Sequence, residues 1–319
     1  MSRVKTVVNV TAHDVRRVAN WPLVINALRE GHKRPKADIG DTFVHNQANT
    51  MLVRSAYVPG IAAGVKAATV VPGNVEKTPP LPSIHAQIML FDPDTGQLMA
   101  LVDGTEVTGW KTAADSALGS DLLSRPDSEG LLMVGAGAMA RPLIEAHLSV
   151  RPSIRKVVIW NRSPQRAHDL LAHWPMEERE GITFEIAEDL PQAAAAADII
   201  SCATMSHDPV LMGDLVSPGT HVDLVGAYKP DMREADDELL QRGRWFVDSY
   251  DTTLDHIGEL KIPLQQGVID RDHICGDLHA LVEGASGRQS DDEITVFKNG
   301  GGAHLDVMVS AALVEAAAR

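Results

Sequence analysis

A short glycine-rich stretch carries the clearest chemical signal in the 319-residue sequence. An apolar run over residues 130–134 leads into Gly135-Ala136-Gly137-Ala138-Met139-Ala140, which has the spacing G-x-G-x-x-A. Between a strand and a helix, the first glycine permits a tight turn, and the second lets the backbone approach a pyrophosphate closely. The free N–H groups at the start of such a helix favour an anion. The stretch therefore predicts a dinucleotide site that includes Gly135, Gly137, Ala138 and Met139.

The end of the next predicted strand bears on which dinucleotide would bind. An acidic residue there would accept hydrogen bonds from a ribose 2′-hydroxyl and favour NAD. The sequence has Asn161-Arg162-Ser163 instead, with Arg166 one turn further on. Neutral Asn161 does not repel a 2′-phosphate, and the groups that follow it can bind one. An alternative is that Arg162 is only a solvated residue at the strand end. We expect NADP(H), held by Asn161, Arg162, Ser163 and Arg166, with NAD(H) as the alternative.

A single lysine interrupts another apolar stretch. Lys66 lies in residues 60–71, whose other members are Gly, Ala, Val, Ile and Thr. A buried ammonium group is unfavourable unless it is paired, so such a lysine is a candidate for polarising a substrate or for acid–base work. The alternative is an edge-strand lysine whose ammonium group reaches solvent.

Other residues of reactive type give weaker signals. Thr204 follows an apolar strand and is expected beside a nicotinamide, although Met205 fits that place equally well. Asp306, near the start of the last predicted helix, is interpreted as a helix-start residue rather than a catalyst. His168 and His173 are five residues apart on a predicted helix and so do not share a face. Because no His-Glu-x-x-His is present either, no metal is expected.

The elements that must position these residues change in kind along the chain. A helix is expected to start at Thr11, where Asp14 completes a capping pattern. Several strand-like runs joined by short turns then predict an antiparallel or mixed sheet. These runs cover residues 43–45, 51–56, 61–71, 84–91 and 97–102.

Beyond Arg125-Pro126-Asp127, short apolar strands alternate with helices. This alternation predicts the α/β class, with a doubly wound parallel sheet. A last helix over residues 303–318 is expected to pack back onto the first domain. The predicted strands of this part cover residues 131–135, 156–161, 182–186, 198–203, 221–226 and 245–248, and the helices between the early ones cover residues 138–147, 164–173 and 190–197.

Composition excludes several classes of protein. The 29 Lys and Arg residues against 43 Asp and Glu residues give a net charge of −14, which argues against a nucleic-acid binder. No window has the run of roughly 18–20 apolar residues that a membrane span requires. The start of the sequence lacks the apolar core of a signal peptide, and two cysteines cannot form a disulfide framework. We therefore expect a soluble, cytoplasmic protein with no nucleic-acid or membrane partner.

Motifs along nearly the whole chain resemble the ornithine cyclodeaminase/mu-crystallin family. They occur in the family's order, and the glycine-rich stretch stands among them. The other motifs are Gly64-Val65-Lys66, Pro72-Gly73-Asn74, Phe91-Asp92-Pro93-Asp94-Thr95-Gly96, Thr112-Ala113-Ala114-Asp115-Ser116-Ala117, Gly258-Glu259-Leu260, Gly287-Arg288, and Glu293 to Lys298 leading to Gly301 and Asp306.

The resemblance implies a particular architecture and set of site residues. A Rossmann domain, residues 123–302, is inserted in an α+β substrate-binding and dimerisation domain, residues 1–122 plus 303–319, of a homodimer. By this resemblance, Lys66 is expected to be the catalytic residue, in contact with the substrate carboxylate or the reacting nitrogen. Thr112 is expected near the cofactor phosphates. The site further includes Gly226 at the cofactor, and Tyr228, Asn299 and Gly301 at the substrate.

Departures from the family pattern favour one activity. Lys111 stands where most members have arginine. The early carboxylate-binding arginine of cyclodeaminases has no clear match around residues 42–45, and Arg54, on a nearby predicted strand, is the candidate to substitute for it. Cyclodeaminases carry at Tyr228 an aspartate that activates water and the amino group, and tyrosine cannot serve as that carboxylate. The resemblance therefore implies NAD(P)H-dependent reduction of a small imino acid, Δ1-pyrroline-2-carboxylate, to L-proline, or of the six-membered Δ1-piperideine-2-carboxylate to L-pipecolate. The alternatives are an ornithine cyclodeaminase, an alanine-dehydrogenase-like reductase of open-chain imines, and a non-enzymatic nucleotide binder.

Overall fold

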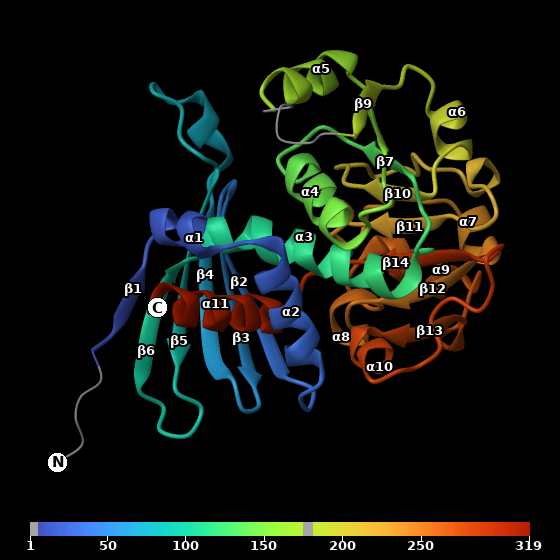
Figure 1. The fold of residues 1–319 in the computed structure, drawn as a ribbon. Helices are drawn as coiled ribbons and strands as arrows, with labels where there is room; N and C mark the ends of the chain where they lie inside the picture. Colours follow the sequence, from blue (N-terminus) through green and yellow to red (C-terminus); the bar gives the residue numbers. More distant parts are fainter. Residues whose placement is uncertain (1–5, 175–180) are drawn as a thin grey trace. The chain divides into compact units, whose positions relative to one another are not determined.

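The computed structural model describes residues 6–174 and 181–319, so the first five residues of the expected substrate domain lie outside the described residues. The chain forms two compact units (Figure 1). Unit 1 comprises the described residues up to Ala114 together with Gly302–Arg319, and unit 2 runs from Asp115 to Gly301. The first division falls inside helix α3 (Gly104–Leu123), earlier than the expected boundary at 122/123, because the first half of that helix packs in unit 1. Trp110 of α3, for example, contacts the ring of Trp21.

Unit 1 contains a six-stranded mixed sheet, as the sequence predicts. The strand order is β1-β6-β5-β4-β3-β2; β1 and β6 pair in parallel, and the other neighbouring strands pair antiparallel. Short turns join β2 to β3, β3 to β4 and β5 to β6, as antiparallel neighbours allow, whereas residues 71–83 form a longer connection between β4 and β5. The strands are β1 (Val8–Val10), β2 (Asp38–Asn46), β3 (Asn49–Val58), β4 (Ala62–Val70), β5 (Ile84–Phe91) and β6 (Leu98–Asp103), with a 3₁₀ turn at Pro72–Glu76.

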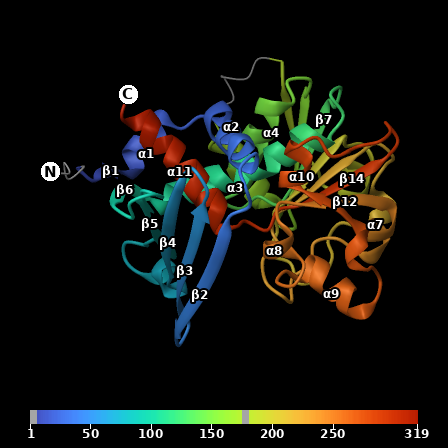
Figure 2. The same ribbon diagram turned by 90° about the horizontal axis from the view of Figure 1, so that it is seen from below.

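Helices cover one face of this sheet. The last helix, α11 (Ala303–Ala317), lies along β3, β4 and β5, which confirms that it packs onto the first domain (Figure 2). The approach is close, because a Cβ atom on Gly64 of β4 would lie 2.5 Å from Val307 of α11. Helix α1 (Ala12–Val18) begins at the predicted Thr11, whose side chain accepts the N–H of Asp14 in a capping box, and α2 (Trp21–His32) packs against α11.

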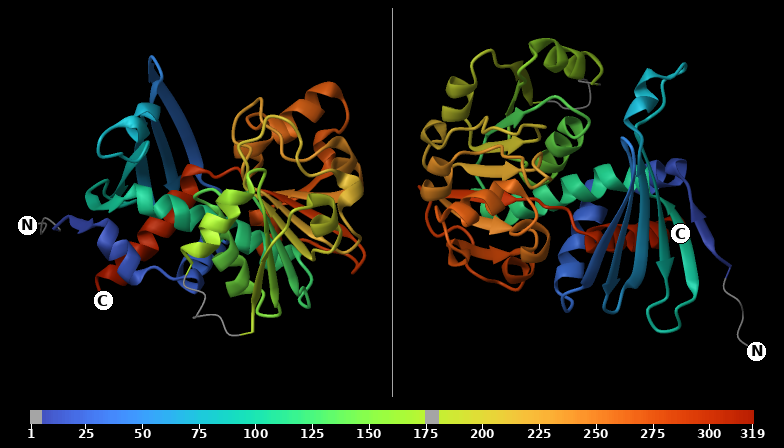
Figure 3. Two further views of the ribbon diagram at one scale, coloured as in Figure 1. Left: turned by 90° about the horizontal axis from the view of Figure 1, so that it is seen from above. Right: turned by 180° about the vertical axis from the view of Figure 1, so that it is seen from behind.

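Unit 2 is a doubly wound α/β domain with eight parallel strands in the order β13-β12-β14-β11-β10-β7-β8-β9. From β7 the chain moves outward through β8 to β9, then returns to β10 on the other side of β7. Since parallel crossovers are right-handed, this reversal places helices on both faces of the sheet (Figure 3). The strands are β7 (Gly130–Val134), β8 (Lys156–Trp160), β9 (Thr183–Ile186), β10 (Ile199–Cys202), β11 (His221–Leu224), β12 (Gly243–Val247), β13 (Ile274–Asp277) and β14 (Ile294–Lys298).

The helices of unit 2 begin and end close to their predicted bounds where the sequence signals them. They are α4 (Ala140–Val150), α5 (Pro164–Ala172), α6 (Leu190–Ala195), α7 (Asp237–Arg242), α8 (Tyr250–Thr253), α9 (Gly258–Gln266) and α10 (Leu278–Val282). Among the described residues, no helix is both long enough and apolar enough to cross a bilayer.

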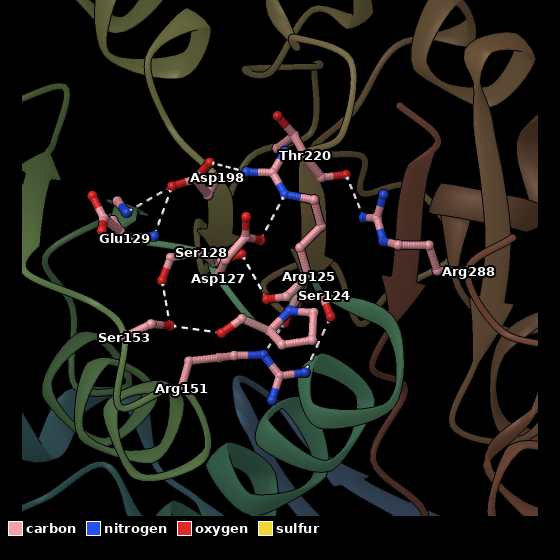
Figure 4. Close-up of polar contacts among 12 residues, drawn as sticks. Ser124, Arg125, Asp127, Ser128, Glu129, Arg151, Ser153, Asp198, Thr220 and Arg288 are labelled. Carbon is pink, nitrogen blue, oxygen red and sulfur yellow. Dashed lines mark hydrogen bonds and ion pairs between the residues drawn. The ribbon is translucent and has the colours of Figure 1, made fainter. Parts of the chain in front are cut away.

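Polar contacts fix the last turn of α3 and the amino-terminal edge of the sheet in unit 2 (Figure 4). The Arg151 guanidinium donates to the carbonyl oxygens of Ser120, Asp121 and Ser124 at 2.9, 2.7 and 3.1 Å. A cation is favourable there because the last carbonyls of a helix have no partner within the helix. At the start of β7, the Asp198 carboxylate accepts the Gly130 N–H at 2.9 Å.

Candidate functional site

The glycine-rich turn has the conformation that its sequence predicts. It joins β7 to α4, and Gly135 has a φ of 116°, which residues with a side chain rarely adopt. A Cβ atom on Gly135 would also lie 2.6 Å from the carbonyl oxygen of Ala203. Gly137 and Ala138 are exposed, and nothing lies within 4 Å of the place that a Cβ of Gly137 would take. The turn thus leaves room for a diphosphate at the start of α4, beside half-buried Met139.

Asn161 lies directly behind this turn. Its side-chain oxygen accepts the N–H of Ala136 at 3.1 Å, and its amide nitrogen donates to the carbonyl oxygen of Ser163 at 2.9 Å. Asn161 therefore fixes the turn and the start of α5 at once, a role that the sequence prediction did not include. Arg162, Ser163 and Arg166 are exposed at the end of β8 and the start of α5.

Two loops follow the neighbouring strands β10 and β11 at the same edge of the sheet. Thr204 belongs to the first loop and Gly226 to the second, and both are half-buried. The backbone N–H groups of both residues donate to the buried carboxylate of Glu234, at 2.7 and 2.6 Å. In an open parallel sheet, ligands bind at the carboxyl ends of the strands where the strand order reverses, which in unit 2 is between β7 and β10. The structure brings the predicted cofactor residues of unit 2 to this edge.

Unit 1 holds a buried ion pair around Lys66. Strand β4 lies between β3 and β5, so the alternative of an edge-strand lysine is wrong, and Lys66 is only 8% exposed. Its Nζ donates to Oδ1 of Asp306 at 2.9 Å and to the hydroxyl of Thr108 at 2.6 Å. The charge is therefore paired as burial requires.

Two further cations of the predicted site belong to the same unit. Arg54 is the cross-strand neighbour of Lys66, and its guanidinium binds the Asp41 carboxylate through Nε and Nη2. Lys111 and Thr112 follow Thr108 on α3 by three and four residues, which places them on one helix face. Lys111 is 4% exposed and acts electrostatically on Asp306. The structure thus assembles an electropositive cluster of Lys66, Arg54 and Lys111 around one carboxylate.

Asp306 is the residue of unit 1 that the sequence prediction undervalued. It lies in the first turn of α11, as expected, but it is also the partner of Lys66 and is 1% exposed. Burial alone would raise the pKa of the Asp306 carboxyl, but the charges of Lys66 and Lys111 and the hydrogen bond from Lys66 outweigh it, and the pKa falls below its ordinary value. Within the described residues, its Oδ2 is buried without a hydrogen-bond partner. An acidic residue inside the apolar run Leu305 to Val309 is the signal that marks it.

The remaining predicted substrate residues lie in unit 2. Tyr228 follows Gly226, is 53% exposed, and has the Lys229 ammonium group 5.4 Å from its ring centroid. Asn299 is buried, and its amide donates to the Ser116 hydroxyl at 3.0 Å. Gly301 has a φ of 69° and donates its N–H to the Asp248 carboxylate at 2.7 Å. Within the described residues, no group of three or more His, Cys, Asp or Glu side chains is arranged to hold a metal ion.

Known proteins resemble this chain over nearly its whole length. A Δ1-pyrroline-2-carboxylate reductase of Paracoccus denitrificans is 50% identical over 294 residues, which is 91% of each chain. The solved structure of the Thermococcus litoralis Δ1-pyrroline-2-carboxylate reductase, in complex with NADH and L-proline, is 31% identical, with a TM-score of 0.89 over 98% of this chain and 97% of that one.

An archaeal alanine dehydrogenase dimer with bound NAD has the same TM-score of 0.89 at 27% identity, over 98% of this chain and 96% of that one. The sequence profile of the ornithine cyclodeaminase/mu-crystallin family matches residues 3–319. With a Rossmann sheet in unit 2, the buried lysine in unit 1 and these relatives, the chain belongs to the ornithine cyclodeaminase/mu-crystallin family.

Proposed function

We propose that this protein is an NAD(P)H-dependent reductase that converts Δ1-pyrroline-2-carboxylate into L-proline. The observation that carries the proposal is the 50% identity, over 91% of both chains, to the Paracoccus denitrificans reductase. The glycine-rich turn of unit 2 and the cationic cluster of unit 1 supply the two binding functions that such a reaction needs. The six-membered imine Δ1-piperideine-2-carboxylate, with L-pipecolate as its product, is the second substrate that we propose.

The cationic cluster suits an anionic imino acid. Lys66, Lys111 and Arg54 attract and orient the substrate carboxylate, which fixes the carbon–nitrogen double bond for reduction. Asp306 holds the Lys66 ammonium group in place through the 2.9 Å hydrogen bond. A reduced nicotinamide, when bound, supplies the hydride that adds to C2 of the imine, and the nitrogen gains a proton. Lys66, or a water molecule that it orders, is the proton source that we propose.

The end of β8 supports a preference for NADP(H). The position that would carry an acidic residue in an NAD enzyme has Asn161, whose side-chain oxygen is already hydrogen-bonded to Ala136. Arg162 and Arg166 are exposed beside it and can form charge-assisted hydrogen bonds with a 2′-phosphate. The resemblance to complexes with NADH and with NAD supports a nicotinamide cofactor in general.

We further propose a cytoplasmic homodimer. The dimeric alanine dehydrogenase has the same fold over 98% of this chain, which supports a dimer. Cys202 is buried and Cys275 is exposed, and both are free thiols, as suits a reducing compartment.

The decisive experiment follows the absorbance of the reduced nicotinamide with purified protein and Δ1-pyrroline-2-carboxylate. We expect oxidation of NADPH that depends on the imine and is abolished by Lys66→Met, which keeps the length of the side chain but removes its charge. Lys156→Met is the matched control, since Lys156 is a half-exposed strand lysine of unit 2 paired with Glu185. Ammonia release from L-ornithine without nucleotide oxidation would instead identify a cyclodeaminase. Oxidation with pyruvate and ammonia, but not with the cyclic imine, would identify an alanine dehydrogenase.

A further inference from the structure

Glu234 is a fully buried carboxylate that no part of the proposed chemistry uses. It lies between β11 and α7, and both of its oxygens are engaged. Oε1 accepts the backbone N–H of Thr204 at 2.7 Å and the Thr204 hydroxyl at 2.8 Å. Oε2 accepts the N–H of Gly226 at 2.6 Å and that of Ala227 at 3.3 Å. Four donors facing two oxygens are the pattern that an ionised carboxylate satisfies and a protonated one does not.

These donors belong to two separate loops that meet at Glu234. Thr204 follows β10, whereas Gly226 and Ala227 follow β11. The loops are in direct contact, because a Cβ atom on Gly226 would overlap the backbone of Thr204 and lie 2.6 Å from Oε1 of Glu234. The first loop also borders the glycine-rich turn, since Gly135 faces the carbonyl oxygen of Ala203. One carboxylate therefore joins two loops at the edge where the nucleotide is expected to lie.

A second layer of buried charge holds Glu234 itself. The Glu259 carboxylate accepts the backbone N–H groups of Glu234 and Ala235 at 2.8 and 3.0 Å. The fully buried Lys298 donates to the carbonyl oxygens of Leu224 and Asn299 at 2.8 and 2.9 Å, and its charge acts on both glutamates. Apolar residues can often replace buried charges without loss of stability. Packing alone therefore does not require this network of buried charges around Glu234.

We propose that Glu234 is a positioning residue for the nucleotide: its ionised carboxylate holds the loops after β10 and β11 in the conformation that receives the nicotinamide end. This proposal rests on the nicotinamide-dependent activity proposed above. Glu234 does not need to touch the nucleotide, because it acts through the backbone of Thr204 and Gly226. Its effect is therefore expected in nucleotide affinity rather than in the affinity for the imino acid, which we assign to Lys66 and its neighbours.

The proposal predicts that nucleotide affinity depends on pH, because the surroundings of Glu234 shift the pKa of its carboxyl. Burial raises the pKa of its carboxyl to about 7, although Lys298 of β14 and the hydrogen bonds from Thr204 act in the opposite direction. Glu259 of α9 raises it further, and burial raises the pKa of the neighbouring Cys202 thiol of β10, which therefore stays neutral. Below this pKa, the proton on the Glu234 carboxyl would face N–H donors of one of the two loops, and a hydrogen bond would be lost. Nucleotide affinity is therefore expected to rise with pH through about 7.

Folding stability should change in the opposite direction over the same range. The pKa of Glu234 is raised above its ordinary value of 4.5, so the folded state holds the proton more tightly than the unfolded state. The contribution of this group to stability is thus fully present below pH 4.5 and is lost as the pH rises through about 7. Opposite pH trends for nucleotide affinity and for stability distinguish a positioning role from a general loss of structure.

The test compares Glu234→Gln with Asp198→Asn. Glutamine has nearly the same shape, but its amide group donates and so opposes the N–H groups of one loop. Asp198 is the matched control: its carboxylate also accepts two backbone N–H groups, of Glu129 and Gly130 at 2.8 and 2.9 Å, but at the opposite edge of the sheet (Figure 4). We expect Glu234→Gln to raise the Kd for NADPH about tenfold and to remove the rise of affinity with pH. Asp198→Asn should lower the Tm and leave both unchanged.

Direct titration of the nucleotide, without imine, separates this proposal from the proposed function. Unaltered affinity and an unaltered pH profile in Glu234→Gln would overturn the positioning role, even if wild-type protein reduces the imine. The proposal would also be overturned if Asp198→Asn and Glu234→Gln had the same Tm and lost the same NADPH affinity. If Glu234→Gln does not fold, Glu234→Asp keeps the charge on a shorter side chain and should bind NADPH with an affinity below that of wild type but retain the rise with pH. Loss of that rise in Glu234→Asp would contradict the proposal.

Discussion

The ammonium group of Lys66 lies 2.9 Å from the carboxylate of Asp306, although 240 residues separate them in the chain. Both side chains are almost completely buried. One comes from the middle of a sheet and the other from the first turn of the helix that covers it. The pair thus depends on the packing of α11 against β4, and it holds a positive charge inside unit 1.

Asp306→Asn is expected to impair both folding and catalysis. Removing one partner of a buried ion pair typically lowers the free energy of unfolding by about 3–5 kcal/mol, because the other charge remains buried. Of its two described partners, the Lys66 ammonium group would keep Thr108 and lose the carboxylate. We therefore expect kcat to fall by a larger factor than that by which the KM for nucleotide rises. Thermal denaturation and steady-state rates test this expectation. Wild-type kcat in a folded Asp306→Asn protein would contradict the assigned role.

The same pair predicts a limit in acid. Because the pKa of Asp306 is lowered below its ordinary value of 3.8, the pair stabilises the folded state above that value. This contribution is lost as the pH falls through the lowered pKa. The difference in unfolding free energy between wild type and Asp306→Asn should therefore be constant near neutral pH and shrink only in strong acid. Denaturant titrations of both proteins across the acid range measure that difference, and a constant difference at every pH would contradict it.

Arg162→Ala should change the choice of nucleotide. If the guanidinium binds a 2′-phosphate, its loss raises the KM for NADPH by about tenfold or more, since a hydrogen bond to a charged group is worth roughly 1.5–3 kcal/mol. The KM for NADH, which lacks that phosphate, should not change. Arg155→Ala is a suitable control, because Arg155 precedes the same strand and donates to the carbonyl oxygen of Ile154 at 3.0 Å. Equal effects on both nucleotides would show that Arg162 does not bind the 2′-phosphate.

Gly135→Ala should disrupt the nucleotide site at its tightest point. The added methyl group would meet the Ala203 carbonyl oxygen, and a φ of 116° is unfavourable for alanine by about 1–3 kcal/mol. We expect a lower Tm and loss of NADPH binding. Gly137→Ala, where a Cβ meets nothing within 4 Å, should fold like wild type but bind nucleotide weakly if backbone approach to the diphosphate matters. Tight binding by both variants would exclude this turn as the site.

Much of the fold follows from local patterns. The strands of unit 1, the capped start of α1 and the strand–helix alternation of unit 2 from β7 to β11 appear where the sequence predicts them, because each depends on neighbouring residues. Strands β13 and β14 and helices α7 to α10 have no predicted counterpart. Helix α3 was not predicted. Its apolar residues are not gathered into one stripe, since much of its surface is buried, and periodicity is then no guide.

The site was predictable only in part, for a related physical reason. Gly135 and Lys66 stand out because a glycine spacing and a charge in an apolar strand are local features. Asp306 and Glu234 gain their importance from partners that folding brings to them from other elements. No spacing in the sequence shows that Glu234 would face the loops after β10 and β11. The sequence therefore does not distinguish Glu234 from the other acidic residues.

The strand order has a practical consequence for anyone who wishes to redesign the nucleotide preference. Residues expected at the 2′-phosphate follow β8, whereas the loops held by Glu234 follow β10 and β11, and β7 lies between β8 and β10 in the sheet. Strands are spaced about 4.8 Å apart, so β8 is roughly 10 Å from β10 and roughly 14 Å from β11. Substitutions at that separation usually have additive free energies. If the nucleotide binds as we propose, its two ends can therefore be retuned independently, by directed evolution or by natural drift, without each change undoing the other.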